Sequence, residues 1–82
     1  MKNLSNKTIL ITGAAGIVGQ SAILECLKRG LYVRAVVFNR NININHKKLE
    51  IVRMDLEDYN NCIEALKDID ICLHFAAFIK GA

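Results

Sequence analysis

Apolar and polar residues follow two different periods along this chain. Short apolar runs rich in β-branched residues are typical of buried strands, whereas apolar residues spaced three or four apart indicate a helix with one buried face. The runs predict strands over Thr8–Thr12, Tyr32–Phe38, Leu49–Met54 and Asp70–Phe75. The helical spacing predicts helices over Ile17–Arg29 and Tyr59–Lys67. Strands that alternate with helical segments favour a parallel sheet built from βαβ units with right-handed crossovers.

Capping residues flank both predicted helices. Gly30 follows the first helix and is a typical stop signal. Asp58 precedes the second helix and is a typical N-cap. The apolar stripe of the second helix is expected to comprise Cys62, Ile63 and Leu66.

Length and composition limit the chain to one domain. It has 82 residues, of which 52% are apolar and 23% charged, and these are ordinary values for a globular chain rather than a disordered one. No apolar stretch approaches the roughly 20 residues that a bilayer span needs. The polar segment Met1–Lys7 is not followed by the apolar core of a signal peptide. We therefore expect a cytoplasmic protein with no membrane partner.

Charge and cysteine content exclude further classes. The net charge of +3 is too small to indicate a nucleic-acid surface, because the basic residues cluster only locally. Cys26, Cys62 and Cys72 are odd in number and lack the spacing of zinc ligands. This pattern argues against a disulfide framework and against a metal site. We expect three reduced, mostly buried thiols.

A glycine-rich loop joins the first predicted strand to the first predicted helix. Its glycines are Gly13, Gly16 and Gly19. In such a loop the first glycine permits a sharp turn, the central one lets backbone N–H groups approach a pyrophosphate, and the third allows close helix packing. The helix would present its unpaired N–H groups at Ile17 and Val18. The alternative is a purely structural turn; a Walker P-loop is excluded because no Gly-Lys-Ser/Thr follows.

The segment Thr12-Gly-Ala-Ala-Gly-Ile-Val-Gly19 resembles the TGxxGxxG fingerprint of extended short-chain dehydrogenase/reductases. That family includes nucleotide-sugar epimerases, dehydratases and reductases, with hydroxysteroid and dihydroflavonol relatives. Two later blocks, Met54-Asp-Leu56 and Leu73-His-Phe-Ala-Ala77, resemble its Asp-Leu pair and its His-x-Ala-Ala block. The resemblance implies an α/β fold with a Rossmann-type parallel sheet of order 3-2-1-4, the incomplete half of a doubly wound fold.

The resemblance also implies roles for residues in the two later blocks. Asp55 would accept a hydrogen bond from the adenine amino group, and Leu56 would pack near the ring. The alternative for Asp55 is a turn residue that helps to start the next helix. After the fourth strand, the cofactor's sugar and diphosphate would lie against Phe75, Ala76 and Ala77. His74 is expected to pack or hydrogen-bond locally rather than react, so no catalytic residue is assigned.

The choice of nicotinamide cofactor rests on the end of the second strand. Dinucleotide folds that use NAD place an acidic residue there, about 20 residues past the glycines, but positions 27–48 contain no Asp or Glu. Asn39 and Arg40 occupy this region, and a guanidinium can bind a 2′-phosphate bidentately. A solvated basic loop is the alternative. We expect NADP to be favoured over NAD.

The family's catalytic Tyr-x-x-x-Lys pair is not found among these 82 residues. Tyr32 is followed four residues later by Val36, and Tyr59 by Ile63. Family epimerases commonly carry a Lys where Ile79 stands here, and this departure weakens the assignment to an epimerase specifically. We therefore expect residues 1–82 to be the amino-terminal part of an NAD(P)-binding Rossmann domain, inactive alone.

Two classes of function remain open. The first is the cofactor-binding portion of a nucleotide-sugar epimerase/dehydratase or related oxidoreductase, whose parent would act on a small-molecule substrate as a homodimer. The second is a non-enzymatic dinucleotide-binding module with a redox-sensing or regulatory role. Neither class requires a nucleic-acid partner.

Overall fold

The computed structural model describes residues 6–75. Its strands are β1 (Thr8–Thr12), β2 (Tyr32–Val37), β3 (Leu49–Arg53) and β4 (Ile71–His74). Its helices are α1 (Ile17–Lys28) and α2 (Tyr59–Ala65). Each predicted element is therefore confirmed, with small differences at the boundaries. Neither helix in this described part is long and apolar enough to cross a membrane.

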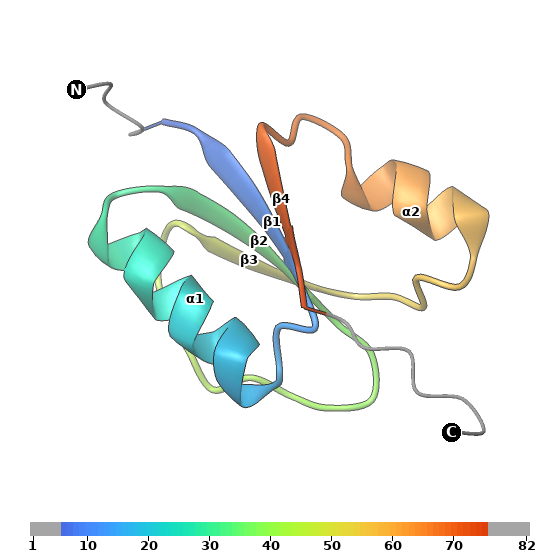
Figure 1. Ribbon diagram of the computed structural model, residues 1–82, viewed down its shortest axis with the longest axis horizontal. Coiled ribbons are helices and arrows are strands. Elements are labelled where there is room, and N and C mark those ends of the chain that lie inside the picture. Colours follow the sequence, from blue (N-terminus) through green and yellow to red (C-terminus); the bar gives the residue numbers. More distant parts are fainter. Residues whose placement is uncertain (1–5, 76–82) are drawn as a thin grey trace.

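The four strands form one parallel sheet in the order β3-β2-β1-β4, which confirms the predicted fold class (Figure 1). β1 lies at the centre, where Ile9 is in register with Val33 of β2 and with Ile71 of β4. Because all strands run the same way, their carboxyl ends meet at one edge of the sheet. In open α/β sheets this edge is where ligands bind.

The sheet is covered by α1 on one face and by α2 on the other (Figure 1). Ile11 and Val33 pack with Ile23 of α1 on the first face. Leu10 packs with Ala65 of α2 on the second face. Side chains of a strand alternate between faces, so a fully apolar run such as Ile9–Ile11 supplies both cores.

Both predicted helix ends are confirmed. Gly30 has φ +82°, a left-handed conformation that favours glycine. The N–H of Leu31 donates to the Cys26 carbonyl at 3.1 Å, which closes the last turn of α1. At the start of α2, Asp58 Oδ1 accepts a hydrogen bond from the N–H of Asn60 at 2.9 Å. Asp58 is thus the N-cap.

The predicted apolar stripe of α2 is half-buried at Cys62 but does not face the core at Ile63 and Leu66. Ile63 is 46% exposed and Leu66 52% exposed, whereas Ala65 is buried. The reason is a tertiary contact: the Arg34 guanidinium on β2 donates to the carbonyl oxygens of Ala65 and Lys67, both at 2.8 Å. These bonds hold the end of α2 against the sheet so that the small side chain of Ala65 faces inward.

The cysteines differ in burial, so the expectation of mostly buried thiols is wrong for Cys72. Cys26 is buried in α1, Cys62 is half-buried, and Cys72 is exposed. Cys72 lies on β4, an edge strand, on the face that α2 covers only in part. Burial raises the pKa of the Cys26 thiol, with a smaller contribution from the carboxylate of Glu25.

Candidate functional site

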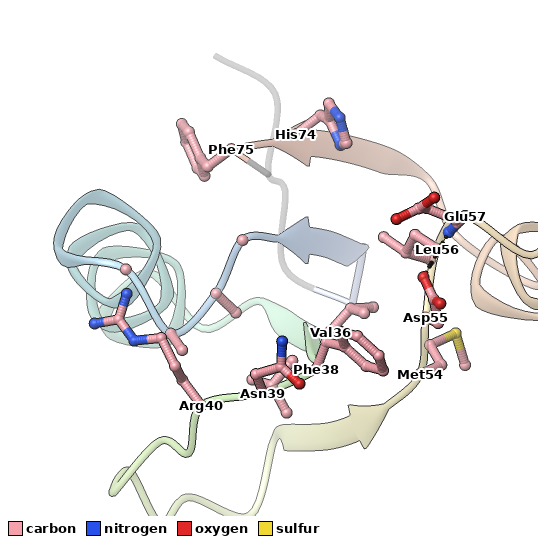
Figure 2. A pocket seen from close by; sticks show the side chains of 15 residues that line it. Val36, Phe38, Asn39, Arg40, Met54, Asp55, Leu56, Glu57, His74 and Phe75 are labelled. Carbon is pink, nitrogen blue, oxygen red and sulfur yellow. Dashed lines mark hydrogen bonds between the residues drawn. The ribbon is translucent and has the colours of Figure 1, made fainter. Parts of the chain in front are cut away.

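A pocket of about 610 Å³ opens at the carboxyl ends of the strands. Segments that follow β1, β2 and β3 contribute to its wall, together with the end of β4 (Figure 2). Of the residues predicted to bind a cofactor, the pocket brings together Gly13, Gly16, Asn39, Arg40, Asp55, Leu56 and Phe75. Residues far apart in the sequence therefore line one cavity.

The glycine loop lines the pocket next to the start of α1. Gly13 has φ +64°, so the turn after β1 uses the left-handed conformation that glycine permits. The N–H of Gly16 donates to the Gly13 carbonyl at 3.2 Å, and Gly16 is the N-cap of α1. No side chain caps this helix. Its first N–H groups therefore form a site suited to an anion.

The second and third glycines meet different surroundings. A Cβ built on Gly19 would lie 2.2 Å from the Gly13 carbonyl oxygen and 2.8 Å from the Ala14 Cα. A Cβ on Gly16 would lie 3.5 Å from its nearest neighbour, the same Gly13 oxygen, at ordinary contact distance. Gly19 therefore allows α1 to pack on the loop, while Gly16 lines the open cavity.

Two residues predicted at the helix start do not line the pocket. Ile17 is 86% exposed and Val18 is 61% exposed, and the cavity wall includes neither. Gly19 is buried and lies outside the wall as well. The prediction for Ile17 and Val18 concerned their backbone N–H groups, which lie in the first turn of α1 next to Gly16.

The segment after β2 provides one side of the pocket. Phe38, Asn39 and Arg40 are exposed and line the cavity. Figure 2 shows Arg40 on the side next to α1, whereas the Phe38 ring points toward Met54. Within the described residues, the Arg40 guanidinium makes no hydrogen bond or ion pair. Its charge is available to a ligand.

Asp55 at the opposite side takes part in a turn. Its Oδ1 accepts from the N–H of Glu57 at 2.9 Å, and its carbonyl accepts from the Asn61 amide at 2.9 Å. The structure therefore contains the turn that was the alternative interpretation of this residue. Asp55 still lines the pocket beside Leu56, so the turn does not remove it from the cavity.

The end of β4 contributes His74 and Phe75 to the pocket wall. His74 Nδ1 lies 2.5 Å from the Thr12 Oγ1, which confirms the expected local hydrogen bond. The N–H of Phe75 donates to the Thr12 carbonyl at 3.1 Å. The predicted contacts of Ala76 and Ala77 lie outside the described residues.

Sequence reasoning missed several wall residues. These are Ala14, Ala15, Val36, Val37, Phe38, Met54, Glu57 and His74. Most are apolar residues at or just after the ends of strands, and in the sequence they look like core positions. Their place at the carboxyl ends of adjacent parallel strands is the signal that could have identified them. Among residues 6–75, no group of three or more His, Cys, Asp or Glu side chains is arranged to hold a metal ion.

The pocket combines an anion site with apolar walls. The N-terminus of α1 and the Arg40 guanidinium favour negative charge at one end. Phe38 and Leu56 supply apolar surface, with the Asp55 carboxylate as a hydrogen-bond acceptor beside them. This arrangement suits an elongated ligand with phosphate groups and a planar ring.

Comparison with known sequences and structures gives consistent matches. The family described as "NAD dependent epimerase/dehydratase family" matches residues 9–82. A 3 beta-hydroxysteroid dehydrogenase/Delta 5-->4-isomerase of Mycobacterium tuberculosis is 35% identical over 72 residues, 88% of this chain and 20% of that protein. A UDP-glucose 4-epimerase of Rickettsia bellii is 30% identical over an alignment of 83 residues, which covers 88% of this chain and 24% of that protein.

A similar protein of known structure was solved with bound ligands. MoeE5 in complex with UDP-glucuronic acid and NAD has a TM-score of 0.72 and 34% sequence identity, over 87% of this chain and 23% of that one. The chain thus spans about a fifth to a quarter of the length of these proteins.

Proposed function

Because this chain belongs to the NAD dependent epimerase/dehydratase family, we propose that residues 1–82 are the amino-terminal part of a dinucleotide-binding domain. The observation that carries this proposal is the cavity at the glycine loop, where the uncapped start of α1 meets the segments after β2 and β3. A bound nicotinamide dinucleotide supplies hydride transfer. The residues described here supply its binding and orientation.

Three parts of the wall would share that binding. The α1 N-terminus beside Gly16 suits the diphosphate. Phe38 and Leu56 offer apolar surface to the adenine, and Asp55 has a carboxylate to accept its amino protons. Arg40 and Asn39 suit the ribose that the adenine carries.

We infer further that NADP binds more tightly than NAD. The family is NAD-dependent and MoeE5 was solved with NAD, so family membership gives no preference for NADP. The preference rests on this chain's own residues: Arg40 lines the pocket without a partner among the described side chains, and positions 27–48 hold no carboxylate. Carboxylates that bind the ribose hydroxyls of NAD would repel a 2′-phosphate.

Replacing Arg40 with alanine tests this choice. Arg40→Ala is expected to weaken NADP binding by about 1.5 to 3 kcal/mol, the range for a hydrogen bond to a charged group, and to leave NAD binding nearly unchanged. Calorimetric titration of the full chain and its variant with both dinucleotides measures the difference. Equal affinity of the unmodified chain for NAD and NADP would contradict the preference.

For the whole protein we propose an oxidoreductase or epimerase/dehydratase that acts on a small-molecule substrate and forms a homodimer. The relatives named above include a UDP-glucose 4-epimerase and a hydroxysteroid dehydrogenase/isomerase, and MoeE5 binds a nucleotide sugar. These names support a nucleotide sugar as the first substrate class to test and a steroid as the second.

The 82 residues alone are expected to show no turnover, because they contain no Tyr-x-x-x-Lys pair. Loss of a positioned general acid/base removes a factor of roughly 10² to 10⁴ in rate. The measurement is NAD(P)H absorbance with nucleotide-sugar and hydroxysteroid substrates. Steady turnover by this chain would contradict the assignment and would direct attention to His74. Binding without turnover in a version extended through a Tyr-x-x-x-Lys pair would favour a non-enzymatic dinucleotide sensor.

A further inference from the structure

Arg53 lies outside the pocket wall but contacts the segment that forms one side of it. It is the last residue of β3, in register with Val37 at the end of β2. Its guanidinium donates one hydrogen bond to the Phe38 carbonyl and a second to the Asn41 side-chain oxygen. The fork of the guanidinium therefore spans the segment that carries Asn39 and Arg40.

This segment has little else to hold it. Residues 38–48 have no helix or strand, and positions 38–41 are all exposed. In the described part of the chain, both hydrogen bonds made to residues 38–45 come from Arg53. Further along the loop, Ile42 and Ile44 are partly buried against the core on the face of the sheet that α1 covers. Among the described residues, the hydrogen bonds that hold positions 38–41 thus come from one side chain.

We propose that Arg53 is a positioning residue for dinucleotide binding, acting through the backbone of Phe38 and the side chain of Asn41. Because it fixes this segment at both ends, it keeps Phe38, Asn39 and Arg40 at the pocket before a ligand arrives. The proposal rests on the proposed function. It differs from the role of Arg40, since Arg40 faces the cavity and Arg53 does not line it.

Affinity for the dinucleotide depends on the fraction of molecules in which positions 38–41 are in place. When a binding-competent conformation is only partly populated, the apparent dissociation constant rises by the inverse of that fraction. If removal of both hydrogen bonds lowers the ordered population to roughly a tenth, affinity falls about tenfold without any lost ligand contact. The loss is expected for NAD and NADP alike.

The test uses Arg53→Ala in the full chain, titrated calorimetrically with NAD and NADP. We expect affinity for both to fall about tenfold, with a thermal midpoint close to that of the unmodified chain. Arg29→Ala is the matched control, because it removes the same charge from an exposed ion pair with Glu25 on α1. Arg53→Lys, which keeps the charge but has no fork, is expected to recover only part of the affinity.

A second variant tests the same contact without changing a residue of β3. Asn41→Ala removes one acceptor of Arg53 from the exposed segment and is expected to give a smaller loss in the same direction; Asn45→Ala, at another exposed position of that loop, is its control. Unchanged affinity in both Arg53→Ala and Asn41→Ala, or an equal loss in Arg29→Ala, would overturn the positioning role alone. Failure of the unmodified chain to bind either dinucleotide would instead overturn the proposed function, and this role with it.

Discussion

Replacing Gly16 with valine is expected to abolish dinucleotide binding and to preserve the fold. Gly16 has φ −75° and ψ 170°, a conformation that any residue adopts, and an added Cβ would meet only ordinary contacts. A branched side chain would instead occupy the cavity in front of the first amides of α1, where a diphosphate must approach. Loss of two hydrogen bonds to a charged group, at about 1.5 to 3 kcal/mol each, weakens binding about 100-fold or more.

Titration calorimetry with NAD and NADP measures this effect, and thermal unfolding checks the fold. Ser21→Val is the matched control, because it adds the same side chain on the exposed side of the same helix. It is expected to bind as the unmodified chain does. An affinity in Gly16→Val equal to that of the control would remove the glycine loop from the binding site.

Replacing Gly19 with alanine is expected to act on stability instead. The new Cβ would lie 2.2 Å from the Gly13 carbonyl oxygen, and backbone cannot yield as a flexible side chain does. Overpacking costs about 1 to 3 kcal/mol and occasionally more, and a clash with backbone belongs at the upper end. A chain of this length has roughly 4 to 12 kcal/mol of stability in total. The expected loss is therefore a large share of it.

The measurement is the thermal midpoint, which is expected to fall by roughly 12 to 24 °C for about 3 kcal/mol. Gly16→Ala is the control, since the same methyl group there has 3.5 Å of clearance. A midpoint for Gly19→Ala within a few degrees of the control would show that α1 shifts freely on the loop. Gly19 could then no longer be assigned to helix packing as distinct from Gly16, which is assigned to ligand binding.

The elements of this fold were predictable because local patterns determine them. The apolar run at Thr8–Thr12, the N-cap at Asp58 and the stop at Gly30 each carry their own signal in adjacent residues. The face of α2 was not predictable in this way. Which side of a short helix is buried depends on the tertiary bond from Arg34 to Ala65, between residues far apart in the chain.

The residues of the site also differ in whether local sequence or tertiary structure determines their position. Gly16 and Asp55 belong to recognisable motifs, so they could be placed in a cavity in advance. Met54 could not, because its place in the wall follows from the register of β3 on β2 rather than from its residue type. The contact of Arg53 with Phe38 has the same origin.

The long connection from β1 to β4 also bears on when the pocket is completed during folding. β2 reaches β1 through one local βαβ unit, but β4 pairs Thr12 with His74, which are 62 residues apart. Contacts of long sequence separation form late, since loop closure must precede any gain from them. β4 also buries little, with only Leu73 packed against a core. We therefore expect the wall at His74 to assemble last and to open first, so hydrogen exchange of its amide protons should report ligand binding.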